Sequence, residues 1–64
     1  MQDVIMELYN QGHSLKYIID FELRRLRDLK FIHEIDFIPT PKIARENVEH
    51  TIYENLMISK GNNN

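Results

Sequence analysis

Residues 14–31 read SLKYIIDFELRRLRDLKF, and this stretch decides the fold. It contains neither Gly nor Pro, and its apolar residues recur at spacings of three and four. This spacing predicts an amphipathic helix, and Ser14 is a residue type that commonly caps the start of one. The predicted buried stripe comprises Leu15, Ile18, Ile19, Leu23, Leu26 and Leu29. We therefore expect this helix to be the centre of an all-α domain.

A second group of side chains falls on the opposite side of the same helix, because each residue advances by about 100°. We call this group the aromatic/Arg face, and it consists of Tyr17, Phe21, Arg24, Arg27 and Phe31. A helix on the edge of a core needs only one apolar side. The second face is covered either by a neighbouring helix or by a partner. Since Tyr and Arg are enriched in binding hot spots, we predict a partner-binding surface.

One charged residue, Glu22, lies within the predicted apolar stripe. A buried carboxylate is costly unless it is paired, and Arg25 lies three residues further on. We expect an ion pair between them at the edge of the core. The alternative is a polar group held for a partner or for setting the register of a dimer.

Two further helices are predicted on either side of the central one. The first covers about residues 3–11, with Asp3 as its cap and Gly12 as its end, since Gly accepts the left-handed conformation found there. The last begins at Thr40-Pro41, a capping residue followed by Pro at the first helical position. It runs to about residue 59, before Gly61. Its inner stripe is Ala44, Val48, Ile52 and Leu56.

The segment from residue 31 to residue 38, FIHEIDFI, fits both a short strand and an extension of the helix. We expect the central helix to continue to about Glu34. Ile38 then precedes Pro39, and a residue before Pro is biased away from helical geometry.

The size of the chain limits its core. With 64 residues and no Cys, it buries only about 60% of its unfolded surface and has no disulfides to support it. Oligomerisation is the remaining support, so we expect a homodimer. Residues 1–61 are predicted to form one helical domain and residues 62–64 a disordered polar tail. The start of the chain lacks the features of a signal peptide, which predicts a cytoplasmic protein with no membrane association.

The residues from Ile5 to Ile18, IMELYNQGHSLKYI, resemble the opening of a helix-turn-helix DNA-binding unit. Leu8, Gly12, Ser14, Leu15 and Ile18 carry the resemblance. It implies a regulator whose contacts with nucleic acid would come from Ser14, Lys16, Arg24, Arg25, Arg27 and Lys30. The chain departs from that family after Ile19, where no Gly, Asn or Pro provides a second turn. The net charge of −2 also differs from the basic balance typical of DNA-binding domains.

No pattern in the chain predicts catalysis, a metal or a cofactor. The three His residues are isolated in the sequence, and a metal site needs three or four converging ligands. No Cys nucleophile and no Gly-rich phosphate loop is present. We therefore predict a small non-enzymatic cytoplasmic regulator that binds another protein through the aromatic/Arg face, with DNA-binding transcription regulation as the alternative. A protein partner is expected, including a second copy of the chain, and no small-molecule substrate.

Overall fold

A computed structural model describes residues 3–61, with side chains through residue 58. Within those residues the chain forms three helices and no strand: α1 (Val4–Asn10), α2 (Leu15–Phe31) and α3 (Pro41–Gly61). The prediction of an all-helical fold is confirmed. The predicted tail, residues 62–64, lies outside the described residues.

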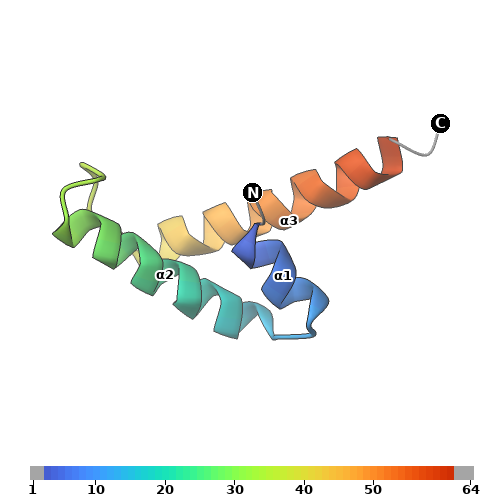
Figure 1. Cartoon of the computed structure of the whole chain (residues 1–64), viewed down its shortest axis with the longest axis horizontal. Helices are drawn as coiled ribbons and strands as arrows, with labels where there is room; N and C mark the ends of the chain where they lie inside the picture. The colour runs from blue at the N-terminus through green and yellow to red at the C-terminus, as the bar shows by residue number, and fades with distance from the viewer. Residues whose placement is uncertain (1–2, 62–64) are drawn as a thin grey trace.

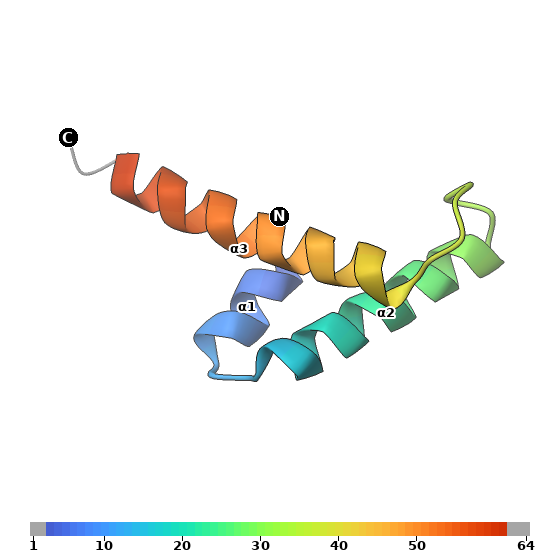
Figure 2. The same cartoon turned by 180° about the vertical axis from the view of Figure 1, so that it is seen from behind.

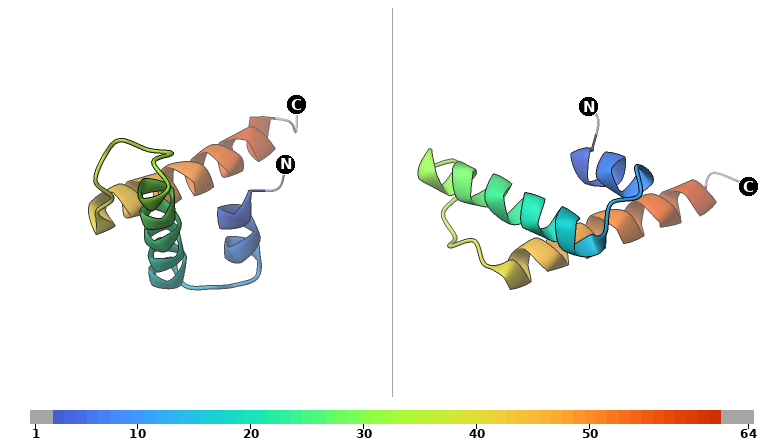
Figure 3. Two further views of the ribbon diagram at one scale, coloured as in Figure 1. Left: turned by 60° about the vertical axis from the view of Figure 1, so that its left-hand side comes forward. Right: turned by 90° about the horizontal axis from the view of Figure 1, so that it is seen from below.

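The two longer helices cross each other, and α1 packs beside both of them near the start of α2 (Figure 1). Seen from behind, α1 lies between the start of α2 and the middle of α3 (Figure 2). The C-terminal ends of α2 and α3 extend beyond the crossing in opposite directions (Figure 3). The molecule is therefore elongated, with extents of 42 × 22 × 21 Å.

The start of each helix is satisfied by the residue that the sequence predicts. Asp3 accepts a hydrogen bond from the backbone N–H of Ile5 at 3.0 Å. Ser14 Oγ accepts one from Tyr17 at 3.1 Å, and Thr40 Oγ1 accepts one from Ile43 at 3.2 Å. Such bonds pair N–H groups that otherwise lack intrahelical partners.

The ends of α1 and α2 share one backbone motif but use different residues in it. After α1, Gly12 has φ +89° and His13 donates its N–H to the carbonyl of Leu8. After α2, His33 has φ 61° and Glu34 donates to the carbonyl of Leu29 at 2.8 Å. Both are Schellman ends, in which the left-handed position is normally Gly. The prediction that α2 continues to Glu34 is wrong, because His33 leaves helical geometry.

Replacing His33 by Gly should raise the free energy of unfolding by about 0.5–1 kcal/mol, because the left-handed conformation is unfavourable for residues with a Cβ. The opposite kind of change at the end of α1, Gly12→Ala, should lower the free energy of unfolding by about 1 kcal/mol. Nothing lies within 4 Å of a Cβ at Gly12, so only the backbone conformation resists that change. Urea unfolding followed by circular dichroism at one protein concentration measures both. A destabilised His33→Gly variant would contradict the prediction.

The core consists of two neighbouring clusters that α2 and α3 share. One joins Ile5 and Ile18 to Val48 and Ile52, and the other joins Leu23 and Leu26 to Ala44. Ile19 packs against both clusters, so they form one continuous apolar layer. The predicted stripes are correct at their centres.

One end of each predicted stripe lies outside this core. Leu15 and Leu56 are each about half exposed, at 49% and 48%. The segment after α2 is irregular, and Ile35 from this segment packs against the second cluster. The described part of α3 extends to Gly61, two residues beyond the predicted end at about residue 59.

Candidate functional site

Four of the five residues of the aromatic/Arg face lie on the exposed side of α2. Tyr17 is 47% exposed and Phe31 is 84% exposed. Arg24 and Arg27 are exposed between them. Because α3 packs on the Leu/Ile stripe of α2, these four side chains are left for contact with solvent or with another molecule.

Phe21, the fifth predicted member of the face, is placed differently. It is half-buried and lines a cleft together with residues at the start of α1. Phe21 therefore lies at the boundary between the aromatic/Arg face and this cleft. Tyr17 is also held in place, because its ring stacks on His13 with centroids 4.3 Å apart and planes 12° apart.

The segment that follows α2 also exposes large apolar side chains. Ile32 is exposed directly after the helix, and Ile38 is 74% exposed just before Pro39. Sequence reasoning did not assign these two residues to a site. The sequence signal for them was weak, because residues 31–38 fit both a short strand and an extension of the helix.

The residues predicted to contact nucleic acid have different surroundings in the structure. Arg25 pairs with Glu22, and Lys30 donates to the backbone carbonyl of Asp36 at 2.9 Å. Ser14 holds the start of α2. Lys16, Arg24 and Arg27 are exposed. Three of the six predicted residues therefore make contacts within the fold and three are exposed without such a contact in the structure, and α2 continues unbroken past Ile19.

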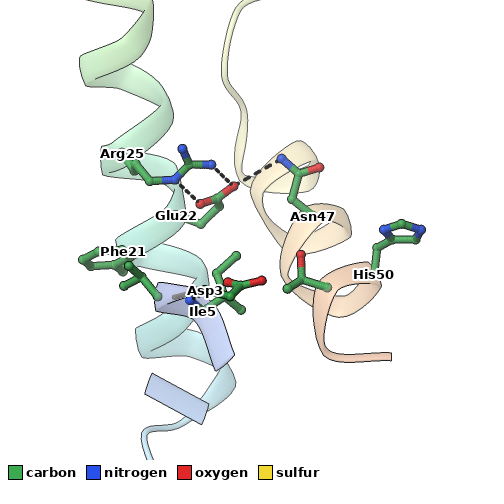
Figure 4. Close-up of a pocket in the computed structure, with 9 residues that line it drawn as sticks. Asp3, Ile5, Phe21, Glu22, Arg25, Asn47 and His50 are labelled. Carbon is green, nitrogen blue, oxygen red and sulfur yellow. Dashed lines mark hydrogen bonds and ion pairs between the residues drawn. The ribbon is translucent and has the colours of Figure 1, made fainter. Parts of the chain in front are cut away.

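A polar joint lies where α2 meets α3. Glu22 is only 1% exposed, and its two carboxylate oxygens accept hydrogen bonds from Arg25 Nε at 2.7 Å and Nη2 at 2.8 Å. Asn47 Nδ2 of α3 donates to the same carboxylate at 3.3 Å (Figure 4). The predicted Glu22–Arg25 pair is confirmed, but its carboxylate lies inside the fold, whereas we expected it at the edge.

The electrostatics of this joint follow from its geometry. The hydrogen bonds to Glu22 raise the pKa of Arg25 above its ordinary value, so the guanidinium stays charged. Its two parallel N–H···O contacts form the bidentate arrangement that makes Arg–carboxylate pairs strong. Every buried side-chain nitrogen and oxygen among the described residues has a hydrogen-bond partner.

Sequence reasoning missed Asn47, which lies 25 residues from Glu22. The sequence did contain an indication. Asn47 is a polar residue next to Val48 and about one turn after Ala44, which are two members of the predicted apolar stripe. Two polar residues on facing helix stripes are an indication that they meet, since buried polar groups need partners. The sequence alone does not say which residues of the two stripes lie opposite each other.

A cleft of ≈ 530 Å³ opens beside the joint, between the start of α1, the middle of α2 and α3. Asp3, Phe21, Asn47, His50 and Thr51 are among its lining residues (Figure 4). His50 forms a 3.3 Å contact with Glu54 along α3. No three His, Asp or Glu side chains of the described residues come together as a metal site would require.

The one fully buried ionisable group of the cleft, Glu22, is already occupied by Arg25 and Asn47. A general base must have its acceptor atoms available to the proton that it removes. The carboxylate of Glu22 is therefore engaged within the fold, by Arg25 of the same helix and by Asn47 of α3.

None of the helices within residues 3–61 is long and apolar enough to cross a membrane. No protein-family model matches the chain, and neither the curated proteins nor the solved structures contain a significant match. Any assignment of function therefore depends on the surface chemistry of the chain itself.

Proposed function

We propose that the protein is a small non-enzymatic cytoplasmic regulator that binds another protein through the aromatic/Arg face, and that it acts as a homodimer. The observation that supports this most directly is the exposure of Phe31, at 84%, next to the exposed Arg27. The core does not need Phe31, because α3 already covers the other side of α2.

The chemistry of the face indicates the kind of partner. Aromatic rings and Arg side chains are the residues that most often dominate the energy of a protein interface. The partner should have a hydrophobic pocket that accepts Phe31 and acidic side chains around the pocket that pair with Arg24 and Arg27. Asp20 and Asp28 are exposed on the same side of α2 and limit which charge patterns are accepted. Inhibitors, antirepressors and assembly factors are all regulators of this kind.

The test is a comparison of two variants in an affinity capture from a lysate of the source cells. Phe31→Ser combined with Tyr17→Ser should abolish retention of the partner, because it removes both rings. The matched control is Tyr9→Ser, which removes an exposed ring from α1. Both variants should keep the wild-type unfolding midpoint, since changes at exposed positions usually alter stability by less than about 0.5 kcal/mol.

Quantitative mass spectrometry identifies the proteins that the wild type and the control retain and the double variant loses. Equal retention by all three would contradict the proposal. DNA binding is measured in parallel by the anisotropy of a labelled duplex at low and moderate salt. Binding that weakens steeply with salt and is lost in Arg24→Glu would indicate phosphate contacts and would favour DNA regulation over protein binding.

A further inference from the structure

The exposed side of α2 carries four charges that alternate in sign every four residues. In order along the helix they are Lys16, Asp20, Arg24 and Asp28, and all four side chains are exposed. Opposite charges four residues apart can pair along a helix, but among the described side chains no ion pair joins any two of these four. This row of charges is therefore open to pairing with another molecule.

The row is complementary to itself when two copies of α2 lie antiparallel. A two-fold axis level with position 22 sets each residue before that position opposite the residue equally far after it in the other copy. Lys16 then faces Asp28 of the second copy, and Asp20 faces Arg24 of the second copy. Each contact occurs twice, because a two-fold interface uses the same patch on both subunits. Every charge of the row thus meets a charge of opposite sign.

Other antiparallel registers lose this match. With the axis level with position 20, Lys16 faces Arg24, and with the axis level with position 24, Asp20 faces Asp28. Like charges set against each other across an interface are unfavourable. With the axis level with position 18 or 26, only two charges of the row find a partner and the other two find none. The charge pattern therefore favours one register.

We propose that the exposed side of α2 binds the same side of a second copy of this chain, antiparallel and level with position 22. The inference rests on the proposed protein-binding face and homodimer, and it names an occupant for that face. In this register Tyr17 faces Arg27 of the second copy, an arrangement that suits a cation–π contact. The stack of Tyr17 on His13 already holds the ring in place.

The contact leaves the end of α2 accessible. The four charges form a row of side chains spaced four residues apart, and two helices that pack through such rows cross at about 50°. The helices therefore diverge on both sides of the axis. Phe31 lies about 13 Å along the helix from position 22, which places it at the end of the contact. There it is available to the other protein that the proposed function requires.

The proposed contact consists mostly of exposed charges, so its strength should depend on salt. Sedimentation equilibrium of the full chain should show a dimer at about 20 mM salt, with a dissociation constant that rises at least about tenfold at about 500 mM. A wild type that is monomeric at about 500 µM protein in the low salt would overturn the proposal. A dimer whose dissociation constant is the same at both salt concentrations would overturn it as well.

Charge reversal at the centre of the contact tests its location. Arg24→Asp and Asp20→Arg each set like charges against each other twice, so each should raise the dissociation constant at least about tenfold. The matched control is Arg45→Asp, which makes the same change of net charge at an exposed position of α3. It should keep the wild-type dissociation constant. Wild-type association in both α2 variants, or an equal loss in the control, would contradict the proposed contact.

A mixture of the two single variants gives the sharpest result. The Asp20→Arg chain has Arg at both positions and the Arg24→Asp chain has Asp at both, so a dimer of one with the other restores every pair. Each variant alone should be monomeric, whereas the mixture should associate about as tightly as the wild type. Folded variants that do not associate on mixing would overturn the proposal.

A double variant covers the outcome in which one single variant fails to fold, as judged by circular dichroism. Asp20→Arg combined with Arg24→Asp exchanges the two charges within one chain and should dimerise like the wild type. A folded double variant that remains monomeric would overturn the proposal.

The results also separate the dimer from the capture of another protein. A wild type that dimerises but retains no other protein rejects the capture and keeps the dimer contact. A monomeric wild type that still captures a partner, and loses it when Phe31 and Tyr17 are replaced, rejects the dimer contact alone.

Discussion

Leu26→Asp should lower the free energy of unfolding by about 4 kcal/mol or more and leave little folded protein. Leu26 is 3% exposed and packs with Leu23 and Ala44 where α2 meets α3. Removing a buried Leu side chain alone costs about 2–5 kcal/mol, and an unpaired carboxylate in an apolar site adds a further cost. A domain of this length is stable by only about 3–10 kcal/mol.

Circular dichroism and urea unfolding measure this effect. The control is Leu26→Met, which nearly conserves volume and should cost less than about 1.5 kcal/mol. If Leu26→Asp retains a cooperative transition at the wild-type midpoint, the second core cluster is not needed for folding. That result would contradict the packing of α2 on α3.

Three features of this fold were predictable because they depend on local chemistry. Asp3, Ser14 and Thr40 each hold a helix start, because a side-chain oxygen can reach an N–H group only two or three residues ahead. Apolar spacing along α2 and α3 identified the residues at the centre of the core. The Glu22–Arg25 pair was predictable for the same reason, since residues three apart are neighbours on a helix.

The differences arise where distant parts of the chain decide the outcome. Leu56 has the spacing of a core residue, but α1 and α2 are too short to reach that part of α3. The contact between Glu22 and Asn47 depends on the relative position of two helices, which periodicity does not specify. His33 ends α2 although His has no strong tendency to end helices, because Ile35 packs back onto the second cluster.

Arg25→Ala should lower the free energy of unfolding by about 2 kcal/mol. Breaking a buried ion pair typically costs about 3–5 kcal/mol, because the remaining charge has no counterpart. The cost is smaller here for two reasons: the Arg25 side chain is 47% exposed, so water can enter its place, and Asn47 still donates to Glu22. Arg25→Lys should have an intermediate effect, since it keeps the charge but loses the bidentate geometry.

A double-mutant cycle shows whether the loss comes from the pair. Glu22→Gln in the wild type should cost about 1 kcal/mol, because it replaces charge-assisted hydrogen bonds with neutral ones. In the Arg25→Ala background the same change should be neutral or stabilising, because an uncharged amide needs no cation. Equal costs in both backgrounds would mean that Glu22 and Arg25 are not coupled.

A separate double variant tests what the contact between Glu22, Arg25 and Asn47 contributes to the fold. A buried carboxylate is weak support for stability, but a polar group that needs one particular partner can fix how two helices align. Glu22→Leu with Arg25→Ala removes the charges and keeps an apolar side chain. If Asn47 fixes the register, this variant should be as stable as the wild type yet give broader side-chain NMR signals. Sharp signals at wild-type stability would show that the apolar layer alone aligns α2 and α3.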